Sequence, residues 1–161
     1  MTKTRTVLQY TLLALLSLSP LGYLGYQKYQ EDHFSCQAEI VIFKDNSYYT
    51  SIMSYRFDGG SGVLDAKGFF KKDGAEIAKI NKKLAFNYWW EGKSLIMVSD
   101  NKYDDKETVA LLNTLTPDFF LYSDRGMTIQ LKRQNASSYL FTQSGAPLFS
   151  CLISKSSRTA S

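Results

Sequence analysis

Alternation of apolar and polar residues is the feature that most limits what this chain can fold into. From Cys36 onward, the runs 36–42, 49–57 and 62–70 each place apolar residues at every second position. A period of two puts alternate side chains on opposite faces of a β-strand. The glycine-rich turn 58–62 joins the second and third runs, so we expect consecutive antiparallel strands.

Short apolar runs continue this pattern toward the end of the chain. The stretch 75–84 is ambiguous because lysines interrupt its sparse apolar residues. No internal repeat is present. A succession of about eight short runs predicts a mainly β fold, with minor α+β character, built as an antiparallel meander. The further expected strands are 84–90, 94–99, 119–122, 127–133, 138–142 and 148–154.

One short helix is expected between the strands 94–99 and 119–122. Asp104 can cap its start and Glu107 occupies the capping-box position, while Thr116-Pro117 should end it. The neighbouring carboxylates of Asp104 and Asp105 can also be read as an acid/base pair. Helix capping explains them better, because negative charge is favourable at a helix N-terminus.

The two cysteines mark the limits of the β domain. Cys36 lies in the first expected strand and Cys151 in the last. In a non-cytoplasmic domain such a pair indicates one disulfide, although two buried free thiols are the alternative. A bond between the first and last strands favours a closed or nearly closed barrel over an open sheet.

The residues Val7–Tyr26 contain no charge, and at helical rise they span roughly 30 Å, the thickness of a bilayer core. We therefore predict a transmembrane helix at 7–26, with Lys3 and Arg5 keeping the N-terminus in the cytoplasm. A cleaved signal peptide is the alternative, but its best cleavage site would leave Pro20 directly after the cut. The expected organisation is a cytoplasmic N-terminus at 1–6, the transmembrane helix at 7–26, a polar tether at 27–35, the β domain at 36–154 and a flexible C-terminal tail at 155–161.

The sequence offers little material for catalysis or for nucleic-acid binding. Two of the 19 basic residues precede the apolar stretch, so the remaining charge is nearly balanced against 15 acidic residues. His33 is the single histidine and falls in the expected tether. It is a possible pH sensor, although a solvated residue without a role is the favoured interpretation. We expect no enzymatic activity, no cofactor and no metal site.

Aromatic residues make up 14% of the chain and are concentrated in a few neighbouring strands. About half fall on the face that we expect to point inward, where they either pack solidly or enclose a cavity for a small apolar ligand. Phe69 and Trp89 fall on the opposite face from their neighbours. Exposed rings of this kind are candidate partner-facing anchors.

The order of these features resembles the FidL-like family of bacterial inner-membrane proteins. The resemblance is carried by the basic N-terminus with one apolar span, the first-strand Cys36, a glycine-marked hairpin with a further glycine on the following strand (Gly60, Gly62 and Gly68), the aromatic strand 84–90, and Pro147 before Cys151. Such proteins are functionally similar to ToxS-like proteins. The resemblance implies a lipocalin-like barrel in the periplasm.

The resemblance also implies a partner, namely a ToxR-like membrane-bound winged-helix transcription activator. The chain would bind this activator as a hetero-oligomer, protect it from proteolysis and promote expression of virulence or fimbrial genes. It would contact the lipid bilayer but no nucleic acid directly, and the pair could bind a small amphipathic ligand. The alternative function is a periplasmic protein that binds or senses a small apolar ligand on its own.

Overall fold

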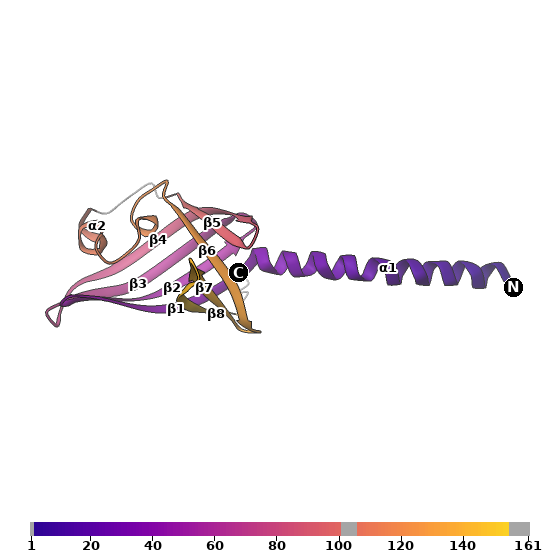
Figure 1. The fold of residues 1–161 in the computed structure, drawn as a ribbon, viewed down its shortest axis with the longest axis horizontal. Coiled ribbons are helices and arrows are strands. Elements are labelled where there is room, and N and C mark those ends of the chain that lie inside the picture. Colours follow the sequence, from indigo (N-terminus) through magenta and orange to yellow (C-terminus); the bar gives the residue numbers. More distant parts are fainter. Residues whose placement is uncertain (1, 101–105, 155–161) are drawn as a thin grey trace, which may run out of the picture. The chain divides into compact units, whose positions relative to one another are not determined.

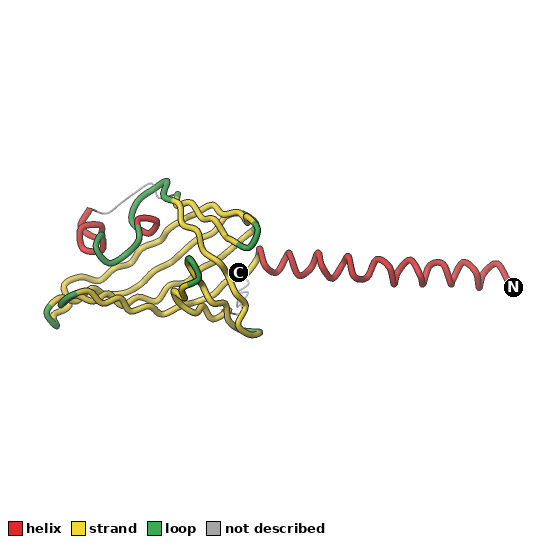
Figure 2. Tube along the Cα trace, in the orientation of Figure 1, coloured by secondary structure: helices red, strands yellow, loops and turns green. Residues whose placement is uncertain are grey.

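The computed structural model describes residues 2–100 and 106–154 and divides the chain into two units, which meet in sequence between His33 and Phe34. The first unit is the helix α1, Thr2–Asp32. The second is a mainly β domain (Figures 1 and 2). Its strands are β1 (His33–Lys44), β2 (Ser47–Asp58), β3 (Ser61–Lys72), β4 (Ala75–Glu91), β5 (Ser94–Ser99), β6 (Gly126–Asn135), β7 (Ser138–Gln143) and β8 (Ala146–Ile153).

Helix α1 differs from the predicted N-terminal organisation. Residues 27–32, expected to form a polar tether, are the last part of the helix, and β1 begins immediately at His33. Within the described residues, no helix combines the length and apolarity needed to cross a membrane. The predicted transmembrane helix at 7–26 is therefore not supported by the structure. Its apolar run ends at Tyr26, and the polar residues 27–32 that follow belong to the same helix.

The eight strands form a closed antiparallel barrel in sequence order. This confirms the predicted mainly β meander and selects a closed barrel over an open, curved sheet. The period-two pattern sets the register, because a shift by one residue would turn every apolar side chain outward. Leu64 on β3 lies opposite both Tyr55 on β2 and Leu84 on β4, and all three side chains are buried.

Two glycines make the β2–β3–β4 part of the barrel possible. Gly60 closes the β2–β3 hairpin with a φ of 98°, a conformation that L side chains rarely adopt. Gly68, inside β3, has no room for a side chain, because a Cβ atom there would collide with the Thr50 carbonyl oxygen and the Ser51 Cα. The glycines of the β2–β3 hairpin thus have a conformational reason in the turn and a steric reason on β3.

The segment between β5 and β6 covers one end of the barrel. It contains α2 (Lys106–Leu112) and the 3₁₀ helix η1 (Asp118–Phe120), and α2 lies beside the outer ends of β3 and β4 in Figure 1. Leu112 and Leu121 of this segment are buried against the barrel. They belong to a second, smaller core cluster together with Tyr49, Phe70 and Ile80.

Two secondary-structure predictions are corrected here, and the one ambiguous stretch is assigned. Residues 119–122 were expected to form a strand, but η1 begins after Pro117, and the Phe120 amide donates to the Pro117 carbonyl at 3.0 Å. The ambiguous stretch 75–84 is the first half of β4. Helix α2 ends at Leu112, before the expected stop at 116–117, with Glu107 in its first turn. The predicted cap Asp104, its neighbour Asp105 and the predicted tail 155–161 lie outside the described residues.

Candidate functional site

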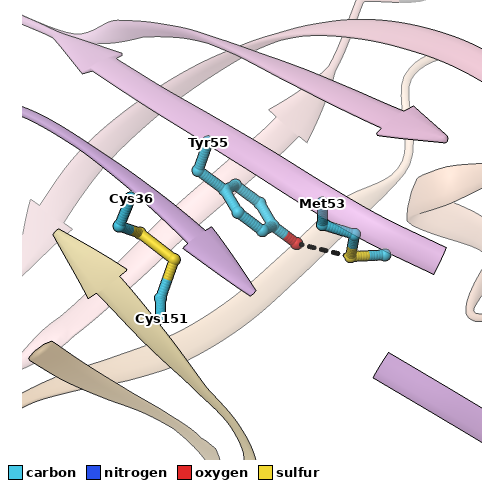
Figure 3. Close-up of a disulfide and its surroundings, with 4 residues drawn as sticks. All are labelled: Cys36, Met53, Tyr55 and Cys151. Carbon is cyan, nitrogen blue, oxygen red and sulfur yellow. Dashed lines mark hydrogen bonds between the residues drawn. A yellow bond between two sulfur atoms is a disulfide. The ribbon is translucent and has the colours of Figure 1, made fainter. Parts of the chain in front are cut away.

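The predicted disulfide is present and closes the barrel (Figure 3). Cys36 on β1 and Cys151 on β8 are bonded across a sequence separation of 115, with Cα atoms 5.4 Å apart. Both residues are buried. In the described chain, backbone pairing between these strands covers two residue pairs, Cys36–Ile153 and Gln37–Leu152. The covalent bond therefore joins two strands whose backbone pairing is short.

The barrel interior is filled by side chains. Tyr55, Phe57, Phe86 and Phe141 are all buried, and the ring centroids of Phe57 and Phe86 are 5.5 Å apart in an edge-to-face contact. An interior pocket beneath α2 and η1 measures about 20 Å³, room for about one water molecule. It is lined by Tyr49, Met53, Leu64, Ala66, Ile80 and neighbouring residues. This pocket is too small for an apolar ligand.

Two buried tyrosines have perturbed acidities, but both are core groups. Burial raises the pKa of Tyr55, whose hydroxyl donates to the Met53 Sδ at 3.6 Å (Figure 3). Burial also raises the pKa of Tyr49, partly opposed by a hydrogen bond with the Ser51 side chain. Since neither phenol faces a partner that could exchange a proton with it, these shifts indicate desolvation rather than catalysis.

His33 lies at the first position of β1 and is exposed. Its ring stacks on Tyr29 with centroids 4.0 Å apart, and its Nδ1 is 2.9 Å from the Tyr29 carbonyl oxygen. Both contacts are with the last turns of α1. Its suggested role in pH sensing stays a prediction.

Among the residues that the structure describes, no group of three or more His, Cys, Asp or Glu side chains is placed to hold a metal ion. The chemically distinctive surface lies instead on the outer face of the barrel. Phe43, Tyr48, Phe69 and Lys71 gather there from β1, β2 and β3, and we call these four residues the aromatic patch.

The three rings of the aromatic patch form a row, in which Tyr48 contacts both Phe43 and Phe69. The Phe43 and Tyr48 centroids are 5.6 Å apart, and those of Tyr48 and Phe69 are 6.4 Å apart, nearly edge to face. The Lys71 Nζ lies 5.0 Å from the Phe69 centroid and 5.6 Å from that of Tyr48. Phe43 is 72% exposed. The patch thus presents apolar rings together with one cation, and its positive charge favours an acidic or aromatic counterpart.

A cleft of about 380 Å³ adjoins the aromatic patch at the tips of two hairpins. The β1–β2 and β3–β4 turns are joined there by Asn46 and Asp73. The Asn46 side-chain amide donates to the Asp73 carboxylate at 2.8 Å, and the Asp73 backbone amide donates to the Asn46 carbonyl at 2.9 Å. Phe43 and Tyr48 line both the cleft and the patch. These two hydrogen bonds connect the two turns directly.

The two predicted partner-facing aromatics do not come together. Phe69 lies opposite Lys79 on β4, whereas Trp89 is ten residues further along the same strand, roughly 33 Å at the rise of a β-strand. Trp89 is 48% exposed and faces outward as expected, opposite Ile96. Phe69 also faces outward but is half-buried, because Lys71 and Tyr48 cover it.

Sequence reasoning missed Phe43, Tyr48 and Lys71 as members of a surface. One signal was available, since Phe43 has the same parity in β1 as the polar residues Gln37 and Glu39 rather than that of the buried Cys36 and Ala38. The convergence of three strands on one patch is not encoded by any single strand and required the register between them.

Comparison with known proteins identifies the barrel domain. Residues 33–151 match the family model of the YqeJ C-terminal domain. Neither curated proteins nor solved structures give a match. The expected likeness to FidL-like proteins, PsaF in particular, and to ToxS is not confirmed by any comparison. The match covers most of the chain and nearly the whole barrel, so this chain belongs to the YqeJ C-terminal domain family.

Proposed function

We propose that this protein is a membrane-anchored periplasmic accessory regulator that binds and stabilises a ToxR-like membrane-bound winged-helix transcription activator. In this role it protects the activator from proteolysis and promotes expression of virulence or fimbrial genes. The aromatic patch is the surface that contacts the activator's periplasmic domain.

The observation that carries the proposal is an exposed aromatic surface on a barrel whose interior is packed. Phe43 is 72% exposed, whereas the interior pocket measures about 20 Å³. Large exposed rings are costly for a protein that works alone and are typical of protein–protein contacts. The alternative function, a carrier or sensor of a small apolar ligand, gains no support from an interior of this size.

A binding partner of this kind acts by mass action. Because the barrel would bind the folded activator and not its opened forms, binding lowers the population that proteases cleave. Anchoring both proteins in the inner membrane raises their effective concentration by confining them to one layer. The uncharged sequence 7–26 is the segment that would provide the anchor in this chain.

The first test compares the lifetime of the activator in cells with and without this protein. We expect a shorter activator half-life and lower output from its target promoter when the protein is deleted. Phe43→Ser, which removes the most exposed ring of the patch, should reproduce much of that loss. Leu148→Ser is the matched control, because Leu148 is also exposed, at 42%, but lies on β8, outside the patch.

Both variants should still form the Cys36–Cys151 disulfide and should unfold in denaturant near the wild-type midpoint, which shows that the barrel has folded. Unchanged activator half-life and unchanged promoter output after deletion would reject the proposed function. If deletion has an effect that Phe43→Ser does not share, the function stands but the aromatic patch is not the contact surface.

A further inference from the structure

Within the described residues, the second half of strand β1 has no strand partner on the side that faces β8, and the Lys44 side chain at its end donates to the Thr114 carbonyl at 3.3 Å. In the described chain, its pairing with β8 ends at Gln37–Leu152, although β1 continues to Lys44. The Ser154 amide donates to the Ser35 carbonyl at 3.0 Å, so the backbone groups of Ser35 point toward β8. Backbone direction alternates along a strand. The N–H and C=O groups of Glu39, Val41 and Phe43 therefore point in the same direction as those of Ser35, toward the side of β1 on which β8 lies. These three residues follow Gln37, the last residue of β1 that pairs with β8.

The side chains on this edge are apolar on both faces. Val41 and Phe43 are 48% and 72% exposed on the outer face, while Ile40 and Ile42 are half-buried on the inner face. The sequence of the edge, Glu39-Ile-Val-Ile-Phe-Lys44, has high β-propensity and a single acid and base at its ends. An edge of this composition is a template for pairing with another strand.

A second strand of the same barrel also extends beyond its neighbour, and its sequence differs from that of β1. The β4–β5 pairing begins at Phe86, so the first part of β4 extends beyond β5. That part carries Lys79 and Lys83 at exposed positions, together with the half-buried Lys82. Lysines on an edge strand discourage intermolecular pairing. Of these two edges, β4 has the protective residues and β1 lacks them, which singles out β1 as the edge that accepts a strand.

We propose that the β1 edge pairs with the β1 edge of a second copy of this chain, forming an antiparallel dimer about a two-fold axis at Val41. An occupant must supply a continuous apolar run with free backbone groups, because both faces of the edge are apolar. The run Ile40–Phe43 of a second copy meets that requirement itself. The inference goes beyond the proposed function and does not depend on it.

The backbone directions, the charges and the existing pairing with β8 together favour one register. With Val41 opposite Val41 of the second copy, Glu39 lies opposite Phe43 of the second copy. The backbone N–H and C=O groups of Glu39, Val41 and Phe43 then form the hydrogen bonds between the two copies. Moving the axis to Ile42 places Glu39 opposite Asp45, and like charges directly opposite each other destabilise a sheet. Moving it to Ile40 requires the backbone of Gln37, which already pairs with Leu152.

Cysteine crosslinking of the full chain tests this register. Residue 41 of the two copies would have Cα atoms about 5.5 Å apart, which is within the range of a disulfide. The two native cysteines are buried and already bonded to each other, so they do not compete. We expect Val41→Cys to give a disulfide-linked dimer on a non-reducing gel after mild oxidation. Ile52→Cys, at a site 45% exposed on the outer face of β2, should remain monomeric.

Sedimentation of the detergent-solubilised full chain provides the second measurement. The wild-type protein should show a mass above the 18.3 kDa of one chain as its concentration rises. Val41→Lys should lose that association, because it places a charge on the two-fold axis, and it leaves all four residues of the aromatic patch in place. A wild-type protein that stays monomeric, or a dimer that Val41→Lys does not weaken, would overturn the proposal. Equal crosslinking of Val41→Cys and Ile52→Cys would do the same.

Discussion

At the scale of single residues, burial determines the chemistry of the polar groups inside the barrel. Tyr55 is 2% exposed, and its hydroxyl has only the weak acceptor Met53 Sδ as a partner in the described structure. The neutral phenol is tolerated there, whereas the phenolate would be desolvated without a compensating donor. This is why burial raises the pKa of Tyr55.

The raised pKa of Tyr55 predicts a loss of stability in alkali. The unfolded chain ionises its tyrosines near pH 10 while the folded chain holds Tyr55 neutral, so the free energy of unfolding should fall as the pH rises above about 10. Tyr55→Phe should unfold at a higher pH than the wild-type protein and change stability little at pH 7. Denaturant unfolding followed at a series of pH values measures both effects. Identical alkaline profiles of the two proteins would contradict this assignment.

At the scale of secondary-structure elements, the sequence located most strands because their two faces differ. The buried and exposed positions of β2 alternate along most of its length, as its apolar and polar residues do. Residues 119–122 were misread because a short apolar run can be a strand or a buried helical turn. Phe119 and Leu121 are indeed buried, but in η1 and the residue after it.

The first half of β4 was ambiguous for a related reason. Lys79 and Lys83 lie at exposed positions of a long strand, whereas Lys82 is half-buried between the inward-facing Ile80 and Leu84 and lines the interior pocket, so the lysines obscured the alternation without breaking the strand. The aromatic patch could be predicted only in part. The alternation along its strand was enough to predict that Phe69 faces outward. Its contact with Tyr48 depends on the β2–β3 register, which places Tyr48 opposite Lys71.

The disulfide is an element-scale feature because it joins the first strand to the last. On the chain-entropy model a loop with a separation of 115 residues contributes about 5 kcal/mol to stability. Cys36→Ser and Cys151→Ser should each lower the free energy of unfolding by up to this amount, and the double variant should be no less stable than either single one. Denaturant midpoints with and without a reductant measure this difference. A wild-type midpoint that reductant leaves unchanged would argue against it.

At the scale of the whole molecule, the barrel and the N-terminal helix are separate units, and the family match begins at residue 33, where β1 begins. The family identifies the barrel, but its function is still a proposal because a fold does not specify an activity. The proposed location follows from two features of the sequence, Lys3 and Arg5 before the uncharged stretch and a disulfide after it.

Topology reporters test this location directly. A periplasm-active reporter fused after Ser161 should be active, and a cytoplasm-active reporter at the same site should be silent. The fractionated protein should remain with the membrane after a high-salt wash, since the proposed anchor is apolar. Activity of the cytoplasmic reporter would remove the basis for the proposed periplasmic partner.

The disulfide between β1 and β8 also has a consequence for the order of events during biosynthesis. Cys36 emerges early, but its native partner is in the last strand, so the barrel cannot be locked until nearly the whole domain has been delivered. The sequence contains no third cysteine, and the waiting thiol therefore cannot mispair within its own chain. Mispaired disulfides can therefore form only with a thiol of another molecule.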